Sequence, residues 1–333
     1  MKKQLYQIAR ILFLTISLLG INNSTVQAQD VLIEVQTYGY YQYQYDQETD
    51  SIHIVGYTGK EEVVKIPSEI EGKPVTKING FGDVYYETIF NIKAPDVKEL
   101  YIPEGVVEIG PYTFMYCIGL EKVELPYGLK VIENDAFVEC TSLTEISIPD
   151  TVTKVGNAAF EGCSKLSKVE LSNNLKVIEE SSFNGCNIKS IQIPDTVTKI
   201  EKNAFRRNKL KEFKIPSSVT HIGANAFAFN RFKKIDIPSN VIRISACAFW
   251  GNSLLREVTI SSGVKQIGYQ AFLDCKNLKK IVIKGTKTKK ILKNAFEGIH
   301  KKATFDVPNK LKKKYKKMLI AGNNFNEKTM KIK

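Results

Sequence analysis

The sequence predicts a repeat solenoid, an α/β-type coil with a short-stranded parallel sheet, on three periodic observations. Phenylalanine returns at steps of 22 to 24 residues; a run of alternating apolar residues precedes most prolines; and an alanine stands before most of the repeated phenylalanines. A unit of this size cannot bury its apolar side alone, so consecutive units must stack. The repeated phenylalanines are Phe114, Phe137, Phe160, Phe183, Phe205, Phe227, Phe249, Phe272 and Phe296.

The unit from Leu143 to Cys163 begins with a short strand. Leu143, Ile146 and Ile148 show the period-2 pattern of a strand with one buried face. Pro149 follows at once, and because proline donates no backbone hydrogen bond, it ends the strand and starts a turn.

The second half of the unit supplies another wall and the phenylalanine. Val152 and Val155 are a second apolar pair, which we expect to line the opposite wall of the coil. Ala159 stands before Phe160, and its small side chain allows neighbouring backbones to approach closely.

The I-P pair after the strand and the G-x-x-A-F block resemble the BspA-like leucine-rich repeats, a bacterial secreted and cell-surface family. The resemblance covers about residues 60 to 300, and G-Y-T-G with Ile66 and Pro67 is similar to the family's entry segment. It implies a right-handed leucine-rich repeat coil and a role in adhesion to host matrix or to other cells. Ser172, Ser261 and Lys284 depart from the pattern by replacing the proline.

The chain divides into four predicted segments. Residues 1–28 read as a secretory signal peptide, with basic residues, then an apolar run too short to span a bilayer, then Val26 and Ala28 at the cleavage positions. Residues 29–60 form a tyrosine-rich entry segment, 61–305 the solenoid and 306–333 a basic C-terminal helical cap. We expect a secreted protein, extracellular or held noncovalently at the cell surface, with no transmembrane segment in the mature chain.

Tyrosine alternates with polar residues from Tyr38 to Tyr45, which predicts a strand with one aromatic face. Such a strand or hairpin can form an N-terminal β cap over the first repeat, whose open edge would otherwise invite aggregation. A carbohydrate-stacking platform is the alternative.

The net charge of +13 is concentrated at the C-terminal end, because residues 276–333 hold 19 basic and 3 acidic residues. Leu311, Tyr315, Met318 and Leu319 recur at helical spacing there. This helix can serve as a terminal cap alone, or as a cap that also binds a polyanion. The polyanion-binding candidates are Lys310, Lys312, Lys313, Lys314, Lys316 and Lys317.

Five of the six cysteines lie three residues after a repeated phenylalanine, where other repeats carry asparagine. Either side chain can satisfy backbone groups at a buried bend, so we expect a ladder of structural thiols; a disulfide or metal cluster is the alternative. The five are Cys117, Cys140, Cys163, Cys186 and Cys275, and the asparagines are Asn208, Asn230 and Asn252. Cys247 replaces polar residues, which predicts an exposed thiol.

Two outward stripes run along the predicted strands. The first alternates acid and base almost without a break, which indicates a self-neutralising structural stripe. Its residues are Glu99, Lys122, Glu145, Lys168, Ser190, Glu212, Lys234, Glu257 and Lys280. The second does not alternate, and by analogy with other solenoids it is the expected ligand-binding surface. Its candidates are Tyr101, Glu124, Ser147, Glu170, Gln192, Lys214, Asp236 and Thr259.

Aromatic residues just after the repeated phenylalanines are a further set of ligand-binding candidates: Tyr116, Phe229 and Trp250. Phe229 and Trp250 belong to adjacent repeats and can form one patch. Tryptophan and tyrosine are frequent at interface hot spots, although packing against a neighbour is the more ordinary role.

The sequence argues against catalysis. Its three histidines lie in the entry segment, a middle repeat and the last repeat, and it has none of the motifs of zinc peptidases, serine hydrolases, P-loop enzymes or calcium loops. We therefore expect a nonenzymatic binding scaffold without cofactor or metal, whose partner is a protein or glycan on a host, matrix or cell surface and not a nucleic acid. An envelope-structural or polyanion-binding protein, anchored to anionic wall polymer through its lysine-rich tail, is the alternative.

Overall fold

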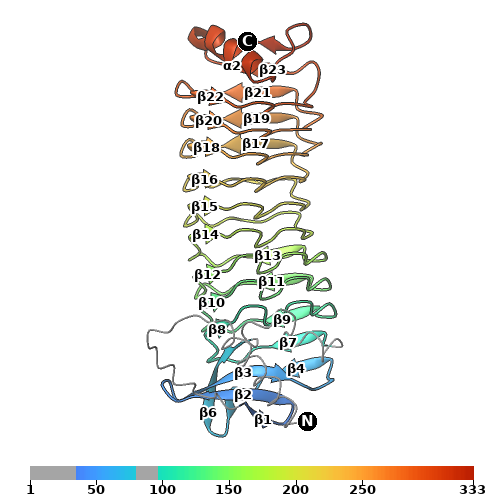
Figure 1. Ribbon diagram of the computed structural model, residues 1–333, viewed down its shortest axis with the longest axis vertical. Coiled ribbons are helices and arrows are strands. Elements are labelled where there is room, and N and C mark those ends of the chain that lie inside the picture. Colours follow the sequence, from blue (N-terminus) through green and yellow to red (C-terminus); the bar gives the residue numbers. More distant parts are fainter. Residues whose placement is uncertain (1–34, 80–96) are drawn as a thin grey trace, which may run out of the picture. The chain divides into compact units, whose positions relative to one another are not determined.

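The computed structural model describes residues 35–79 and 97–333, and most of this length is a coil of stacked turns, here called rungs (Figure 1). The predicted signal peptide lies outside the described residues. A typical rung carries two short strands, and strands of successive rungs pair in parallel in two columns. The predicted coil with a short-stranded parallel sheet is confirmed, and its second wall is also built of strands.

The N-terminal part is an antiparallel hairpin joined to the coil. Strands β1 (Gln36–Tyr38), β2 (Tyr41–Asp46) and β3 (Ser51–Tyr57) pair in antiparallel order, and β3 pairs in parallel with β6 (Lys73–Ile78). A short strand β5 (Glu69–Ile70) forms a hairpin with β6. Tyr43 is buried, whereas Tyr45 is exposed. The predicted hairpin is therefore present, and its role as a cap stays a prediction.

The second column is built from the V-x-x-I segments and continues from β6. Each strand has two residues, the first facing outward and the second buried. In order they are β8 (Glu108–Ile109), β10 (Val131–Ile132), β12 (Lys154–Val155), β14 (Val177–Ile178), β15 (Lys199–Ile200), β16 (His221–Ile222), β18 (Arg243–Ile244), β20 (Gln266–Ile267) and β22 (Lys290–Ile291).

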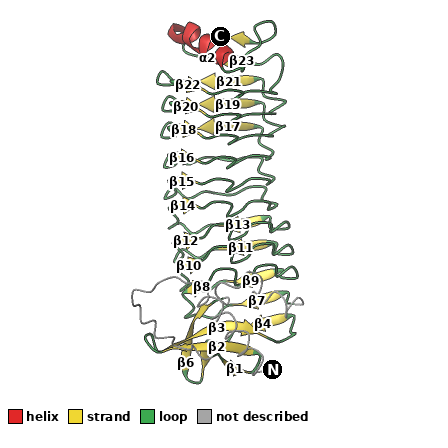
Figure 2. Ribbon diagram, viewed as in Figure 1, coloured by secondary structure: helices red, strands yellow, loops and turns green. Residues whose placement is uncertain are grey.

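The front column is built from the L-x-x-I-x-I segments, and its pairing is interrupted. One sheet contains β4 (Val63–Lys65), β7 (Glu99–Tyr101) and β9 (Lys122–Glu124); a second contains β11 (Glu145–Ser147) and β13 (Lys168–Glu170); a third contains β17 (Lys234–Ile237), β19 (Glu257–Ile260), β21 (Lys280–Ile283), β23 (Thr304–Asp306) and β24 (Lys331–Ile332). The two rungs between β13 and β17 have no front strand (Figure 2).

The core contains a continuous stack of phenylalanine rings. All nine repeated phenylalanines are buried, and adjacent ring centroids lie 5.1 to 5.8 Å apart with interplanar angles of 1° to 24°. Offset stacking of this kind adds to the gain from burying each ring. The ring stack therefore fixes each rung against the next.

A left-handed residue stands two positions before and two positions after each of these phenylalanines. Fourteen of the eighteen are not glycine, with φ between 52° and 59°, and include Ala158, Arg207 and Phe229. The other four are Gly162, Gly185, Gly251 and Gly298. This conformation costs a non-glycine residue about 1 kcal/mol or more. The cost is offset because the left-handed residues orient the backbone groups of the bend toward the neighbouring rungs.

The bend contains the predicted ladder of cysteine and asparagine. The thiols of Cys140, Cys163, Cys186 and Cys275 and the amide groups of Asn208, Asn230 and Asn252 each donate to the carbonyl oxygen of the phenylalanine one rung before, at 2.7 to 3.3 Å. All six cysteines are free thiols; the five ladder thiols are buried and Cys247 is half-buried. The structural reading of the ladder is confirmed, and Cys247 is less exposed than expected.

The choice between cysteine and asparagine in a rung depends on the corner of the rung before it. The corner is the segment between the ladder residue and the next core residue. After Cys140 the next core residue is Leu143, but after Cys186 it is Ile188, one residue sooner. In that shorter corner the Ile188 N–H donates to the Asn208 side-chain oxygen of the next rung at 3.0 Å. The Leu210 N–H likewise donates to Asn230 at 3.1 Å.

In longer corners the equivalent N–H has a backbone partner instead. The Leu143 N–H donates to the Cys140 carbonyl oxygen at 3.1 Å. An amide both donates and accepts, whereas a thiol serves here only as a donor. At Asn208 and Asn230, asparagine therefore supplies the acceptor that the short corner lacks. Asn252 also follows a short corner, but its side-chain oxygen has no hydrogen-bond partner.

The C-terminal residues form a short 3-10 turn, η1 (Asn309–Leu311), and the helix α2 (Lys312–Ala321). Tyr315 and Leu319 are buried, and the Tyr315 hydroxyl donates to the Gly285 carbonyl oxygen. The Gly322 carbonyl oxygen and the Asn324 side-chain oxygen accept from the Asn294 and Phe296 N–H groups at 2.7 and 2.9 Å.

The lysine-bearing helix predicted from the sequence is thus present, and these contacts support the prediction that it acts as a cap. The α/β-type label applies only to this end, since α2 is the one α-helix in the described residues. No helix in residues 35–79 or 97–333 has the length and apolar character to cross a membrane.

The asparagine ladder yields a first prediction. The variant Asn230→Cys keeps a donor for the Phe205 carbonyl but leaves the Leu210 N–H without its acceptor, which costs about 1 to 3 kcal/mol for a buried group. Urea titration followed by circular dichroism measures the loss. The control Asn277→Cys, at an exposed corner, should change stability by less than about 0.5 kcal/mol; equal losses for both variants would contradict the corner rule.

The thiol ladder yields a second prediction. Burial raises the pKa of the Cys117, Cys140, Cys186 and Cys275 thiols, so little reactive thiolate forms near pH 8. A thiol reagent such as Ellman's should modify only Cys247 quickly in the folded protein and all six cysteines after unfolding in guanidinium. Cys247→Ser should abolish the fast phase. Several fast-reacting thiols in that folded variant would refute the buried ladder.

Candidate functional site

The outward side chains of the front column form two parallel stripes, as the alternation predicted. Strand pairing sets Glu145 opposite Lys168, and Glu257 between Lys234 and Lys280. Ion pairs join these side chains at 3.3 to 3.8 Å. The first stripe therefore neutralises itself within the protein in both of these sheets.

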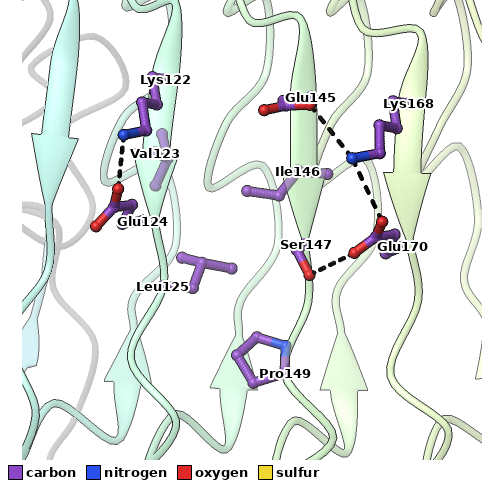
Figure 3. A pocket seen from close by; sticks show the side chains of 10 residues that line it. All are labelled: Lys122, Val123, Glu124, Leu125, Glu145, Ile146, Ser147, Pro149, Lys168 and Glu170. Atoms are coloured by element: carbon purple, nitrogen blue, oxygen red, sulfur yellow. Dashed lines mark hydrogen bonds and ion pairs between the residues drawn. The ribbon is translucent and has the colours of Figure 1, made fainter.

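The second stripe lies beside three adjoining hollows in the front column. The first hollow, of about 340 Å³, is lined by Glu124, Ser147 and Glu170, together with Leu125 and Pro149 (Figure 3). The second and third hollows, of about 540 and 510 Å³, extend it across the next rungs. We call the three together the front groove; it is lined by residues within 122–125, 145–149, 167–173, 189–196 and 214–216.

The hollows lie where the front column loses its pairing. The first bridges the break between β9 and β11, and the other two border the rungs without a front strand, around Gln192 and Lys214. Both of those rungs have the shorter corner, which the rung of β17 shares although it keeps its front strand. A change in corner length thus coincides with a change in the surface, and the 22-residue steps are the sequence signal that could have located it.

Charge and hydrogen bonding hold the first hollow in a defined arrangement. Glu170 accepts from the Ser147 hydroxyl at 2.9 Å and pairs with Lys168 at 3.4 Å, and both interactions lower the pKa of its carboxyl. Lys122 lies 2.6 Å from Glu124, a contact that raises the pKa of the lysine. The groove therefore presents carboxylates beside lysine ammonium groups, and Figure 3 shows these side chains in contact.

The arrangement suits an extended partner better than a compact ligand. Each hollow is within the usual size range of small-molecule sites, but the hollows adjoin one another, and their walls carry charged and polar side chains from successive rungs beside apolar surface. Neighbouring strands lie about 4.8 Å apart. The groove thus offers a carboxylate, hydroxyl, amide or ammonium group at nearly every rung.

Five of the predicted stripe residues line the front groove: Glu124, Ser147, Glu170, Gln192 and Lys214. The other three, Tyr101, Asp236 and Thr259, lie on paired strands to either side. Tyr101 is half-buried and donates a hydrogen bond to Glu99 at 2.6 Å. The sequence did not identify Leu125 and Ile191, half-buried apolar residues that line the hollows.

The predicted aromatic patch is present at a separate place, the bend after the ring stack. The rings of Phe229 and Trp250 lie 4.6 Å apart, and the Trp250 indole N–H donates to Asp274 at 3.4 Å. Arg206 lies over the Phe229 ring at 5.7 Å. Tyr116 occupies the bend of the Phe114 rung, so it does not join this patch.

The helix lysines are exposed, as predicted, and Lys316 pairs with Glu327 at 2.7 Å. Nothing in the described part of the chain groups three or more histidine, cysteine, aspartate or glutamate side chains around a possible metal position.

Comparison with known proteins identifies the repeat. The family model described as the BspA type leucine rich repeat region matches residues 86–211 and 198–326, in six copies. A search of curated proteins gives no match.

Among solved structures, a leucine-rich repeat protein from Bacteroides ovatus is similar with a TM-score of 0.57, 20% identity, and coverage of 81% of this chain and 84% of that one. The pneumococcal vaccine antigen PcpA is similar with a TM-score of 0.50, 16% identity and coverage of 90% and 98%. At these identities the likeness shows a shared fold.

The aromatic patch gives a third prediction. Phe229 has φ 58° and its half-buried ring covers Gly251 of the next rung. In Phe229→Gly, relief of the left-handed strain offsets the lost ring contact, so the free energy of unfolding should change by less than about 1 kcal/mol.

Thermal and urea unfolding measure this change. The comparison variant Phe232→Ala removes a buried ring and should cost about 3 to 5 kcal/mol. Similar losses in the two variants would show that Phe229 is a core residue.

Proposed function

Because the chain belongs to the BspA-type leucine-rich repeat family, we propose that it is a secreted, nonenzymatic binding scaffold that uses its front groove to recognise a protein or glycan on a host, matrix or cell surface. The repeats form a leucine-rich scaffold in which equivalent outward side chains of successive rungs lie side by side. Adhesion is the function that fits such a surface in an exported protein. Export itself rests on the signal pattern of residues 1–28.

The observation that carries the proposal is the front groove. Solenoids bind partners over extended surfaces built from one or two side chains per repeat. Here the polar side chains of the second stripe border hollows that span several consecutive rungs, from Glu124 to Lys214. An extended peptide or glycan segment lying across the rungs could contact each of them in turn.

The absence of an enzymatic role is part of the proposal. His53 lies on β3 at 3.4 Å from Asp46, and His221 lies in a middle rung at 3.8 Å from Glu201. Catalysis by proton transfer needs an acid or base placed beside a reacting group, and neither histidine lines the front groove.

A second candidate function is retention at the cell envelope through the C-terminal lysines. It is favoured by a specific observation: α2 buries Tyr315 and Leu319 against the last rung, while its lysines face outward. An anionic wall polymer is the partner that such a surface fits.

The front groove gives a fourth prediction. The double variant Glu124→Arg and Glu170→Arg reverses charge at two positions of the groove and should reduce binding at least about tenfold, since like-charge contacts oppose a complementary partner. Residues 29–333 are tested for binding to immobilised fibronectin, collagen and peptidoglycan.

The matched control is Glu133→Arg and Glu180→Arg. These glutamates are also paired with lysine, at 2.8 and 2.6 Å, but follow strands of the second column. Both double variants should melt within about 2 °C of each other, because all four side chains are outside the core. Equal binding by the two, or no binding of wild type to any of the three surfaces, would sink the proposal.

A further inference from the structure

The outward face of the second column becomes basic toward its C-terminal end. Strand pairing places His221 beside Arg243, Arg243 beside Gln266 and Gln266 beside Lys290. The residues just before these strands are linked in the same way, since the Lys289 N–H donates to the Lys265 carbonyl oxygen at 2.8 Å. The exposed bases of this region, here called the basic strip, are Arg243, Lys265, Lys289, Lys290 and Lys293.

Acidic residues of the same rungs lie elsewhere. Between residues 223 and 296 the acids are Asp236, Glu257 and Asp274. Two of them belong to front strands β17 and β19, and the third follows the ring stack. In earlier rungs the second column carries its own acids, and ion pairs join Lys154 to Glu133 and Lys202 to Glu180.

The C-terminal helix continues the basic strip. The Gly322 carbonyl oxygen accepts from the Asn294 N–H, and the Asn324 amide donates to the Leu292 carbonyl oxygen at 3.0 Å, which joins the end of α2 to the segment that carries Lys293. The exposed helix lysines, among them Lys312 and Lys313, therefore belong to the same end of the coil as the strip.

We propose that the basic strip and the α2 lysines together form one binding surface for a linear phosphate polymer lying along the stack. This rests on the second proposed function and adds residues of the coil to the site. Bases on neighbouring strands, about 4.8 Å apart, can follow the charges of a flexible polyanion. Release of the polymer's counterions drives such binding and makes it depend steeply on salt.

The geometry favours a polymer over a membrane surface. Helices that bind in the membrane interface insert an apolar face among the lipids. The apolar side of α2 is already occupied, because Tyr315 and Leu319 are buried against the last rung. The basic strip runs from rung to rung along a sheet. This linear arrangement of bases matches the linear arrangement of phosphate charges in a polymer.

The test uses residues 29–333 and long-chain inorganic polyphosphate, with orthophosphate and phosphatidylglycerol vesicles as comparison ligands. The strip variant is Arg243→Gln, Lys265→Gln and Lys290→Gln; the helix variant is Lys312→Gln, Lys313→Gln and Lys317→Gln. A control with the same loss of charge is Lys165→Gln, Lys211→Gln and Arg231→Gln, all exposed and outside both surfaces. Affinity is measured by fluorescence anisotropy over a salt series.

We expect the strip and helix variants each to lose about tenfold or more in polyphosphate affinity and to lower the salt slope by about two to three, while the control stays near wild type. Orthophosphate should bind far more weakly than the polymer, since it cannot contact several bases at once.

Two results would overturn the proposal. If only the helix variant weakens binding, the strip has no part in the site, although retention through the tail would stand. If wild type ignores polyphosphate, or prefers the vesicles, both this surface and its polymer partner are refuted. All variants must first melt no lower than wild type, because the replaced side chains are exposed.

Discussion

The hydrogen bonding between rungs at the phenylalanine bend is the interaction on which the rest of the structure depends. Each rung there must satisfy backbone groups of its neighbours, because water is excluded by the stacked rings and an unpaired buried group is costly. The bend meets this demand with two left-handed residues around each ring and with a cysteine or asparagine that donates to the previous phenylalanine carbonyl. The phenylalanines recur every 22 to 24 residues in the sequence because each rung contains one such bend.

The same constraint explains where recognition surfaces can arise. Residues that form the bend or the core are required for the stacking of the rungs. The outward residues of the two columns are not, so these are the residues that can differ between rungs. In the front column even the strand pairing is interrupted, between β9 and β11 and again between β13 and β17, while the second column remains paired through the latter rungs. The second column has its own break, between β12 and β14, where the front strands β11 and β13 are paired. At each break one wall therefore keeps its pairing, and the front wall can form a groove.

The sequence predicts the features that recur in every repeat. It does not predict the features that arise from the length of a particular corner. The stacked coil, the buried thiols of Cys140 and Cys163, the patch of Phe229 with Trp250 and the exposed helix lysines followed from spacing alone. The asparagines were equated with the cysteines, because an alignment on the phenylalanine hides the missing corner residue before Ile188 and Leu210. The front groove and the basic strip could not be derived from periodicity, since both arise from pairing between rungs.

Charge is distributed differently on the two columns, and this difference has a physical consequence. In the front column, acids and bases alternate and pair, as Glu257 does with Lys280, so the stripe carries little net field. In the second column, the last ion pair within the described residues joins His221 to Glu201. The bases beyond it lie near one another, within the screening length of about 8 to 10 Å at physiological salt. Like charges held this close raise the free energy of the folded coil. An anionic partner would remove that repulsion on binding, and so the same residues that cost stability in the free protein would add to affinity for a polyanion.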